Sequence, residues 1–254
     1  MNSASVGWQC PDCVKESAKS APQMSARRAM QGAPPIVTYV LIGINVAVFL
    51  VGLFTGAGIM DTGGTTFVRL ALYGPLVGAG EWYRLITGGF MHDGLIHIGL
   101  NMYVLYFVGR QLEPAIGRAR FVLGYFVCLL GGSLGAILLT PDSATVGASG
   151  AIFGTFGLLA VLEYSRGINP LSSGIGPTII LNLVITFALP GISKGGHLGG
   201  LLVGAAVGAV LFLGKDIRQQ PSNERLARAA AVGLIGVACF VIALATAPAL
   251  PLLR

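Results

Sequence analysis

Ser149 and His197 are the residues whose chemistry stands out in this sequence. Ser149 follows Gly147 and Ala148, His197 follows Gly196, and each lies in a long apolar stretch. Polar side chains are costly in such stretches and need a reason. A serine becomes a nucleophile when a base takes its proton, and imidazole titrates near neutrality. Neither stretch contains Asp or Glu, so the pattern predicts acyl transfer by a Ser–His dyad rather than a triad.

Three further residues could support this dyad. His97 and Asn101 are four residues apart and share one face of a helix, where they could donate hydrogen bonds to a developing oxyanion. The backbone N–H of Ser149 could add another donor. Phe153 lies four residues after Ser149 and could hold the imidazole of His197. The alternatives are that Asn101 joins helices and that Phe153 is a core or lipid-facing aromatic.

The three histidines of the chain could also suggest a metal. His92 precedes His97 by five residues, which is about 140° around a helix, so we expect it on another face, capping the outer end. This spacing does not place two ligands on one face, and no His-Glu-x-x-His pattern or nearby carboxylate base is present. We therefore predict no metal and no cofactor.

Small residues could bring the two stretches together. Close approach of helices in lipid needs residues without bulky side chains. Four-residue spacing relates Gly150 to Gly154 after Ser149, and it relates four glycines around His197: Gly196, Gly200, Gly204 and Gly208. Such rows alone often do no more than pack helices, but their position beside the two polar residues favours a dyad.

The composition indicates a protein with several membrane spans. Charged residues make up only 10% of the 254 residues, against roughly a quarter in soluble domains, and hydrophobic residues make up 54%. The mean hydropathy is +0.78. These values exclude a disordered chain, a coiled coil and a secreted disulfide scaffold, and they argue against a soluble globule.

Uncharged stretches predict an all-α bundle of seven transmembrane helices. A helix needs about 20 apolar residues to cross the hydrocarbon. The expected spans are 36–54, 94–109, 121–140, 143–162, 167–193, 195–214 and 229–253, the last helical to residue 246. The polar, glycine-rich segment 55–93 is expected to be a long outer loop.

The distribution of Lys and Arg predicts a cytoplasmic N-terminus. With that orientation only Arg69, Arg84, Lys194 and Arg254 lie outside, against twelve of the 16 inside. The net charge of +6 therefore reflects topology, and we expect no nucleic-acid partner. Both polar stretches then enter from the outside, so Ser149 and His197 would lie at similar depth, one or two turns below the outer surface.

This ordered set of residues resembles the rhomboid family of intramembrane serine proteases. The resemblance covers roughly residues 36–214 in the same order and spacing. Tyr83 stands where the family usually has Trp, and Trp82 is one place early. The motifs are His92-x4-His97-x3-Asn101, Gly147-x-Ser149-Gly150, Gly196-His197 with Gly200 and Gly204, Tyr83-Arg84, and Gly109-Arg110 with Glu113.

The resemblance implies a six-helix core with assigned residue roles. Ser149 would be the nucleophile and His197 its base, with Phe153 stacked on the imidazole. His97 and Asn101 would line the oxyanion site. The loop 55–93 would lie at the membrane edge, stabilised by Arg84 and Glu113. A mobile fifth helix at about 177–190 and a cap loop at 191–195 would admit substrate.

The family also implies a function and a location. The chain would be an endopeptidase of the plasma membrane that cleaves single-pass transmembrane substrates near the outer face. A second class is a catalytically silent rhomboid-like chaperone or scaffold, which would predict loss of Ser149 or His197. A third is a transporter, which usually carries charges or broken helices at the midplane. The sequence indicates no oligomeric state.

The regions outside the core are less informative. Residues 1–35 are expected to be a flexible cytoplasmic tail, and 215–254 a cytoplasmic linker with the seventh helix. Cys10 and Cys13 look like the last knuckle of a zinc module that precedes some actinobacterial rhomboids. One such pair cannot complete a four-ligand zinc site. Either the chain starts late, or a second molecule completes the site, or the pair is a remnant.

Overall fold

The structure is a computed structural model that describes residues 2–3, 8–9, 34–60, 63–214 and 220–249. The chain divides into two compact units, 1–34 and 35–254. In the first unit, strand β1 (Asn2–Ser3) pairs antiparallel with β2 (Trp8–Gln9), and Asn2 lies opposite Gln9. Cys10 and Cys13 lie outside the described residues, so the expectations for that pair stay predictions.

The second unit is a helical bundle, which confirms the all-α membrane fold. The helices of 14 residues or more within the described ranges are α3 (Ile36–Phe54), α7 (Leu95–Ile116), α8 (Arg118–Leu139), α9 (Ser149–Ser165), α10 (Ile175–Ala188), α11 (Lys194–Phe212) and α12 (Ser222–Thr246). By length and composition, α3, α8, α11 and α12 can each cross a membrane, while α9 and α10 are shorter apolar helices.

Glycines bring three helices into backbone contact at the centre of the bundle. A Cβ atom on Gly200 of α11 would lie only 1.9 Å from the carbonyl oxygen of Gly150 in α9, and one on Gly204 would lie 1.9 Å from that of Gly154. Helix α8 joins them, since a Cβ on Gly195 would lie 2.1 Å from the oxygen of Gly135. The sequence predicted the rows on α9 and α11 but not the contribution of α8.

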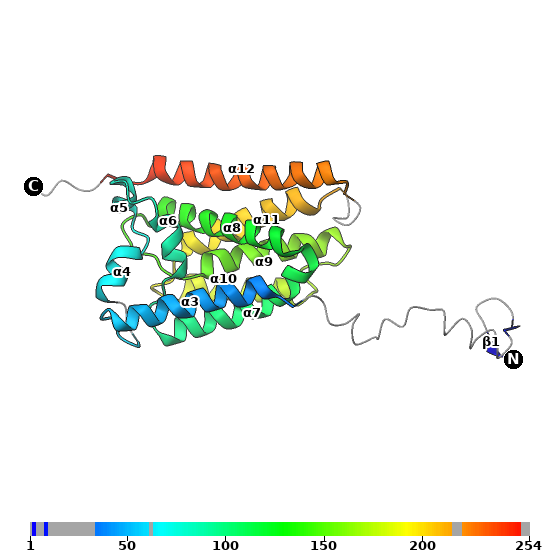
Figure 1. The fold of residues 1–254 in the computed structure, drawn as a ribbon, viewed down its shortest axis with the longest axis horizontal. Coiled ribbons are helices and arrows are strands. Elements are labelled where there is room, and N and C mark those ends of the chain that lie inside the picture. Colours follow the sequence, from blue (N-terminus) through cyan, green and yellow to red (C-terminus); the bar gives the residue numbers. More distant parts are fainter. Residues whose placement is uncertain (1, 4–7, 10–33, 61–62, 215–219, 250–254) are drawn as a thin grey trace, which may run out of the picture. The chain divides into compact units, whose positions relative to one another are not determined.

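The remaining long helices lie around this centre. Helix α12 packs on α8, and α3 packs on α7. In Figure 1, α12 follows one side of the bundle, while α3 and α7 follow the other. The outward faces of α3 and α12 are rich in exposed apolar side chains such as Val40 and Leu234, as expected of surfaces that face lipid.

The described part of the segment 55–93, which is expected to be a long outer loop, contains several short helices. It contains α4 (Gly64–Leu70), α5 (Gly74–Gly78), α6 (Arg84–Thr87) and the 3₁₀ turn η1 (Gly88–Phe90), which gather at one end of the bundle (Figure 1). Leu72 and Thr145 exchange two backbone hydrogen bonds of 3.1 and 2.8 Å. The segment is thereby tied to the chain that leads into α9.

Several helix boundaries differ from the expected ones. Helix α7 continues to Ile116 instead of ending at residue 109. A charged residue such as Glu113 can lie inside the protein within a helix when its charge finds hydrogen-bond partners. Helix α9 starts at Ser149 instead of residue 143. Hydropathy marks apolar stretches, and such stretches include turns as well as helices.

Candidate active site

Ser149 is the first residue of α9, immediately after a turn that only glycine suits. Gly147 has a φ of +120°, in the region that other residues rarely adopt. A Cβ atom there would also lie 2.7 Å from Nε2 of His97 and 3.5 Å from Oγ of Ser149. Gly147 therefore turns the chain and lets the His97 ring approach the serine.

The position of Ser149 has an electrostatic consequence. The first N–H groups of a helix lack partners within it, and the helix dipole places partial positive charge at this end. The Ala148 N–H is bound by the His92 ring, while the N–H groups of the first turn of α9 point out of its N-terminal end. This arrangement suits negative charge that develops next to the serine.

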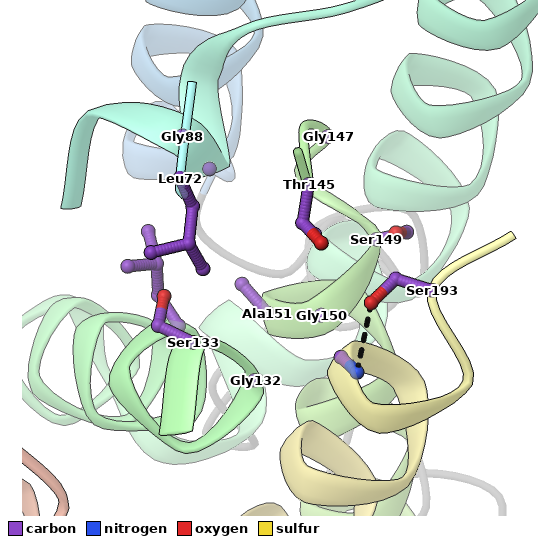
Figure 2. A pocket seen from close by; sticks show the side chains of 13 residues that line it. Leu72, Gly88, Gly132, Ser133, Thr145, Gly147, Ser149, Gly150, Ala151 and Ser193 are labelled. Atoms are coloured by element: carbon purple, nitrogen blue, oxygen red, sulfur yellow. Dashed lines mark hydrogen bonds between the residues drawn. The ribbon is translucent and has the colours of Figure 1, made fainter. Parts of the chain in front are cut away.

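His197 lies in the first turn of α11 and is held by its neighbours. Its ring stacks on Phe153 with 4.0 Å between centroids and 16° between planes. Ser193 caps α11 by accepting a 3.1 Å hydrogen bond from the Gly196 N–H, which Figure 2 shows as a dashed line. The imidazole is 8% exposed, so its orientation is determined by protein contacts rather than by water.

Thr186 of α10 is a further contact of His197 that sequence reasoning missed. Its Oγ1 lies 2.7 Å from Nδ1 of the imidazole and 2.6 Å from the carbonyl oxygen of Asn182. Thr178, Asn182 and Thr186 recur every fourth residue on an otherwise apolar helix. That polar row was a usable signal, but it did not show which helix the row would face.

The described residues bring Ser149 and His197 onto facing helices. A Cβ atom on Gly150 would lie 3.3 Å from the Gly196 oxygen, so the residues next to the candidate dyad are in contact. Phe153, one turn after Ser149, carries the His197 ring. No hydrogen bond joins the Ser149 hydroxyl to the imidazole in the described part of the chain. Catalytic hydrogen bonds are often long without substrate.

His97 is bound by an acidic residue that sequence reasoning also missed. Nδ1 of His97 is hydrogen-bonded to the carboxylate of Asp93, one turn earlier. Partial burial acts to raise the pKa of Asp93, but the hydrogen bond and the charge of His97 outweigh it and lower that pKa. The other ring nitrogen of His97 faces Gly147. The sequence thus contains an Asp–His pair near Ser149, but Asp93 lies outside the apolar stretches of Ser149 and His197.

His92 lies beside His97, which corrects the expectation from helical geometry. The two rings are 5.0 Å apart between centroids. Helix α7 begins at Leu95, so the angle of a helix does not apply to His92. Nε2 of His92 accepts a hydrogen bond from the Ala148 N–H at 3.4 Å. Burial, followed by the charge of His97, lowers the pKa of His92 to about 3. A neutral His92 therefore supports the turn before Ser149.

Asn101 lies on the same helix as His97 and is committed to its backbone. Its Nδ2 donates a 2.9 Å hydrogen bond to the carbonyl oxygen of His97. Its Oδ1 is buried without a hydrogen-bond partner among the described residues. An amide nitrogen has two protons, so one remains for another acceptor.

A small cavity adjoins Ser149 on the side of the glycine-rich turn. Its volume is about 30 Å³, which is room for about two water molecules. Ser133, Thr145, Ser149 and Ser193 are among the residues that line it, and Figure 2 labels all four. The cavity can therefore hold water next to the serine at a point where the chain is otherwise apolar.

Arg84 is bonded to the segment 55–93, which the resemblance implies that it stabilises. Its guanidinium is 4% exposed and binds the carbonyl oxygens of Ala71 at 2.7 Å and Val68 at 2.9 Å. It also pairs with Glu81, which accepts a hydrogen bond from Tyr83. The bonds from Tyr83 and Arg84 lower the pKa of Glu81. This network joins α4 to α6.

Glu113 has a different role from the expected one. Its carboxylate accepts hydrogen bonds from the backbone N–H groups of Val37 and Thr38 and from the Thr38 hydroxyl, at 2.8 to 3.0 Å. It therefore binds the N-terminus of α3, where orphan N–H groups and the helix dipole favour an anion. This is the opposite end of α3 and α7 from the segment 55–93, so Glu113 does not stabilise that segment.

Comparison with known proteins agrees with these features. The Rhomboid domain matches residues 79–214, from the end of α5 to the end of α11. The chain is 33% identical over 192 residues to the Rhomboid protease GluP of Bacillus subtilis, covering 73% of this chain and 36% of that protein.

Two eukaryotic relatives are also similar to this chain. Rhomboid-like protease 1 of Toxoplasma gondii is 31% identical over 183 residues, which is 68% of this chain and 62% of that protein. Rhomboid-type serine protease 2 of Emericella nidulans is 35% identical over 134 residues, which is 50% of this chain and 26% of that protein. The match spans about a quarter to three fifths of these relatives. A family domain that covers more than half of the chain shows that it belongs to the rhomboid family of multi-pass membrane proteins.

Proposed function

We propose that this chain is an intramembrane serine endopeptidase with Ser149 as nucleophile and His197 as general base. The observation that carries the proposal is the placement of His197, whose ring is fixed by Phe153 and Thr186 on the helix that faces Ser149. Relatives named as rhomboid proteases and a serine protease support the same chemistry.

The first half of the reaction forms an acyl-enzyme. Nε2 of His197 takes the Ser149 proton while Oγ attacks the scissile carbonyl carbon. The tetrahedral intermediate then expels the amine, which receives that proton from His197. Substrate leaves the helical state at the scissile bond, because a carbonyl bonded within a helix is not free for attack.

Donors on three sides stabilise the oxyanion. The start of α9 supplies backbone N–H groups, the His97 ring approaches across Gly147, and the Asn101 amide follows one turn later on α7. Each well-placed donor contributes on the order of 10²- to 10³-fold to the rate. Hydrolysis of the acyl-enzyme needs water in the membrane, and the cavity beside Ser149 can hold it.

The proposal includes a place in the cell and a class of partner. We propose a plasma-membrane protein with a cytoplasmic N-terminus, an active site that opens to the outer face, and single-pass transmembrane proteins as substrates. Positive charges support this orientation, because Arg118, Arg120, Arg166 and Arg225 lie at the ends of helices away from Ser149. Residues 36–214 would form the core, and 215–254 a linker and seventh helix.

Cleavage of a single-pass transmembrane reporter by the purified chain in liposomes tests the proposal. We expect one cleavage site near one end of the reporter segment and no cleavage by Ser149→Ala. Ser165→Ala is the matched control, since Ser165 lies at the other end of α9 and donates a hydrogen bond to the Leu162 carbonyl oxygen of the same helix. Undiminished cleavage by Ser149→Ala would assign the nucleophile elsewhere. Reporter binding without cleavage by the wild type would favour the scaffold function.

A further inference from the structure

We propose that Thr186 is a positioning residue that holds His197 in the tautomer a general base requires, with the proton on Nδ1 and the lone pair on Nε2. The proposal deepens the function above, on which its kinetic part rests. Its structural part concerns only a proton on a ring and can be tested without activity.

The argument starts from the single proton of the Thr186 hydroxyl. Oγ1 lies 2.6 Å from the Asn182 carbonyl oxygen, which can only accept, so the hydroxyl donates there. Threonine in a helix commonly makes this bond to the residue four positions earlier. The hydroxyl has no second proton for the imidazole, 2.7 Å away. In that contact Nδ1 of His197 must therefore donate and Oγ1 must accept.

The consequence lies on the other side of the ring. A neutral imidazole has one N–H, so a proton on Nδ1 leaves a lone pair on Nε2. The Phe153 ring covers one face of the imidazole and limits its rotation. The hydroxyl thus performs here the orienting task that a carboxylate performs in a triad. It does so without a second buried charge, which would be costly at this depth.

The surroundings of Thr186 show that this contact is specific. Helix α10 is mostly exposed to the surrounding medium. Among its described residues after Gly176, Thr186 is the one that is buried, with 0% exposure. Neighbouring Ile185 and Phe187 are 40% and 53% exposed. The contact at Thr186 therefore joins α10 directly to the base, and the tautomer of His197 depends on α10 lying against α11.

Histidine 15N NMR tests the structural part. The chain has three histidines, so selective labelling with His92→Gln and His97→Gln reference spectra assigns the His197 ring. The measurement uses the Ser149→Ala protein in detergent at about pH 8, above the ordinary titration range of imidazole. We expect a protonated Nδ1 and an unprotonated Nε2, and a mixture of the two tautomers in Thr186→Val.

Kinetics test the consequence for the reaction. Thr186→Val removes the hydroxyl at nearly constant shape. We expect kcat to fall about tenfold to a hundredfold, while KM changes by less than about twofold. The loss in kcat should be only a part of the 10²- to 10⁴-fold that a general base contributes to the rate. Thr186→Ser restores the acceptor and should recover most of kcat. Thr178→Val is the matched control, because Thr178 makes the same helical bond to Gly174 and does not touch His197.

The outcomes separate this inference from the proposed function. A His197 tautomer that is unchanged in Thr186→Val overturns the inference even if Ser149 and His197 prove essential. The expected tautomer and its loss in Thr186→Val support the inference even if the wild type cleaves nothing, in which case the proposed function fails alone. Equal losses of kcat in Thr186→Val and Thr178→Val would show that Thr186 acts only through the stability of α10 and would overturn the inference.

Discussion

Two imidazoles belong to the candidate site around Ser149, and their environments differ. His197 is buried, stacks on Phe153 and meets the hydroxyl of Thr186. His97 is partly exposed and meets the carboxylate of Asp93. A neutral hydroxyl such as that of Thr186 suits an imidazole that must offer a lone pair. A carboxylate such as that of Asp93 suits an imidazole that faces developing negative charge, because the carboxylate can pair with positive charge on the ring. This difference is the reason why our proposal gives the role of base to His197 and an electrostatic role to His97.

The largest expected effect comes from removing one ring or the other. His197→Ala should lower kcat at least about 10³-fold, since general-base catalysis contributes 10²- to 10⁴-fold. His97→Ala should cost about 10²-fold, as expected of one oxyanion donor. Reporter cleavage at saturating substrate in liposomes gives both values. If His97→Ala proved the more damaging of the two, the assignment of roles would be reversed.

Gly147 lies between His97 and Ser149, so its replacement tests whether the His97 ring must approach that closely. Gly147→Ala should lower kcat on the order of 10²-fold, because a small displacement of reacting groups has effects of this size. Gly117→Ala is the control, since Gly117 also has a positive φ of +86° but no atom within 4 Å of an added Cβ. Equal kcat values for the two variants would show that backbone strain alone is responsible.

A smaller effect should follow from removing the charge of Asp93 while keeping its shape. Asp93→Asn leaves a partner for His97 but no anion, and we expect kcat/KM to fall about tenfold, as for second-sphere groups that orient a ring. Asp142→Asn, an exposed residue in the turn before α9, should have no effect. A wild-type rate in Asp93→Asn would mean that the carboxylate has no part in the reaction.

His92 provides a test through stability rather than rate. Its folded-state pKa of about 3 lies below the ordinary value, so the unfolded chain binds the proton first as the pH falls. The contribution of His92 to stability should therefore be constant above about pH 7 and decline between about pH 6.5 and pH 3, by at most about 1.4 kcal/mol per pH unit. Thermal unfolding in detergent should show this decline, and His92→Gln should reduce it. An unchanged profile in that variant would place the titration elsewhere.

The parts of the site that could be read from the sequence follow from local spacing. Phe153 shares a helix face with Ser149, and the glycine rows of α9 and α11 show where backbones meet. The contacts of Thr186 and Asp93 could not be read in this way. Thr186 meets His197 only because α10 packs against α11, and Asp93 precedes the helix on which His97 was placed.

The wrong expectations have physical causes of their own. The angle between His92 and His97 assumed a helix that begins only at Leu95. The role of Glu113 was taken from a resemblance, whereas its carboxylate binds the exposed N–H groups at the start of α3. The fold itself was predictable, because uncharged stretches of about 20 residues leave few alternatives to membrane helices. Their exact ends depend on capping partners that hydropathy does not report.

The rate at which a fluorophosphonate probe labels Ser149 tests the central claim most directly. Labelling requires an activated serine but no transmembrane substrate, so mass spectrometry of the labelled peptide reports on the base alone. The account predicts labelling at Ser149 in the wild type, a small decrease in His97→Ala and a near-complete loss in His197→Ala. Labelling that survives in His197→Ala but disappears in His97→Ala would contradict it.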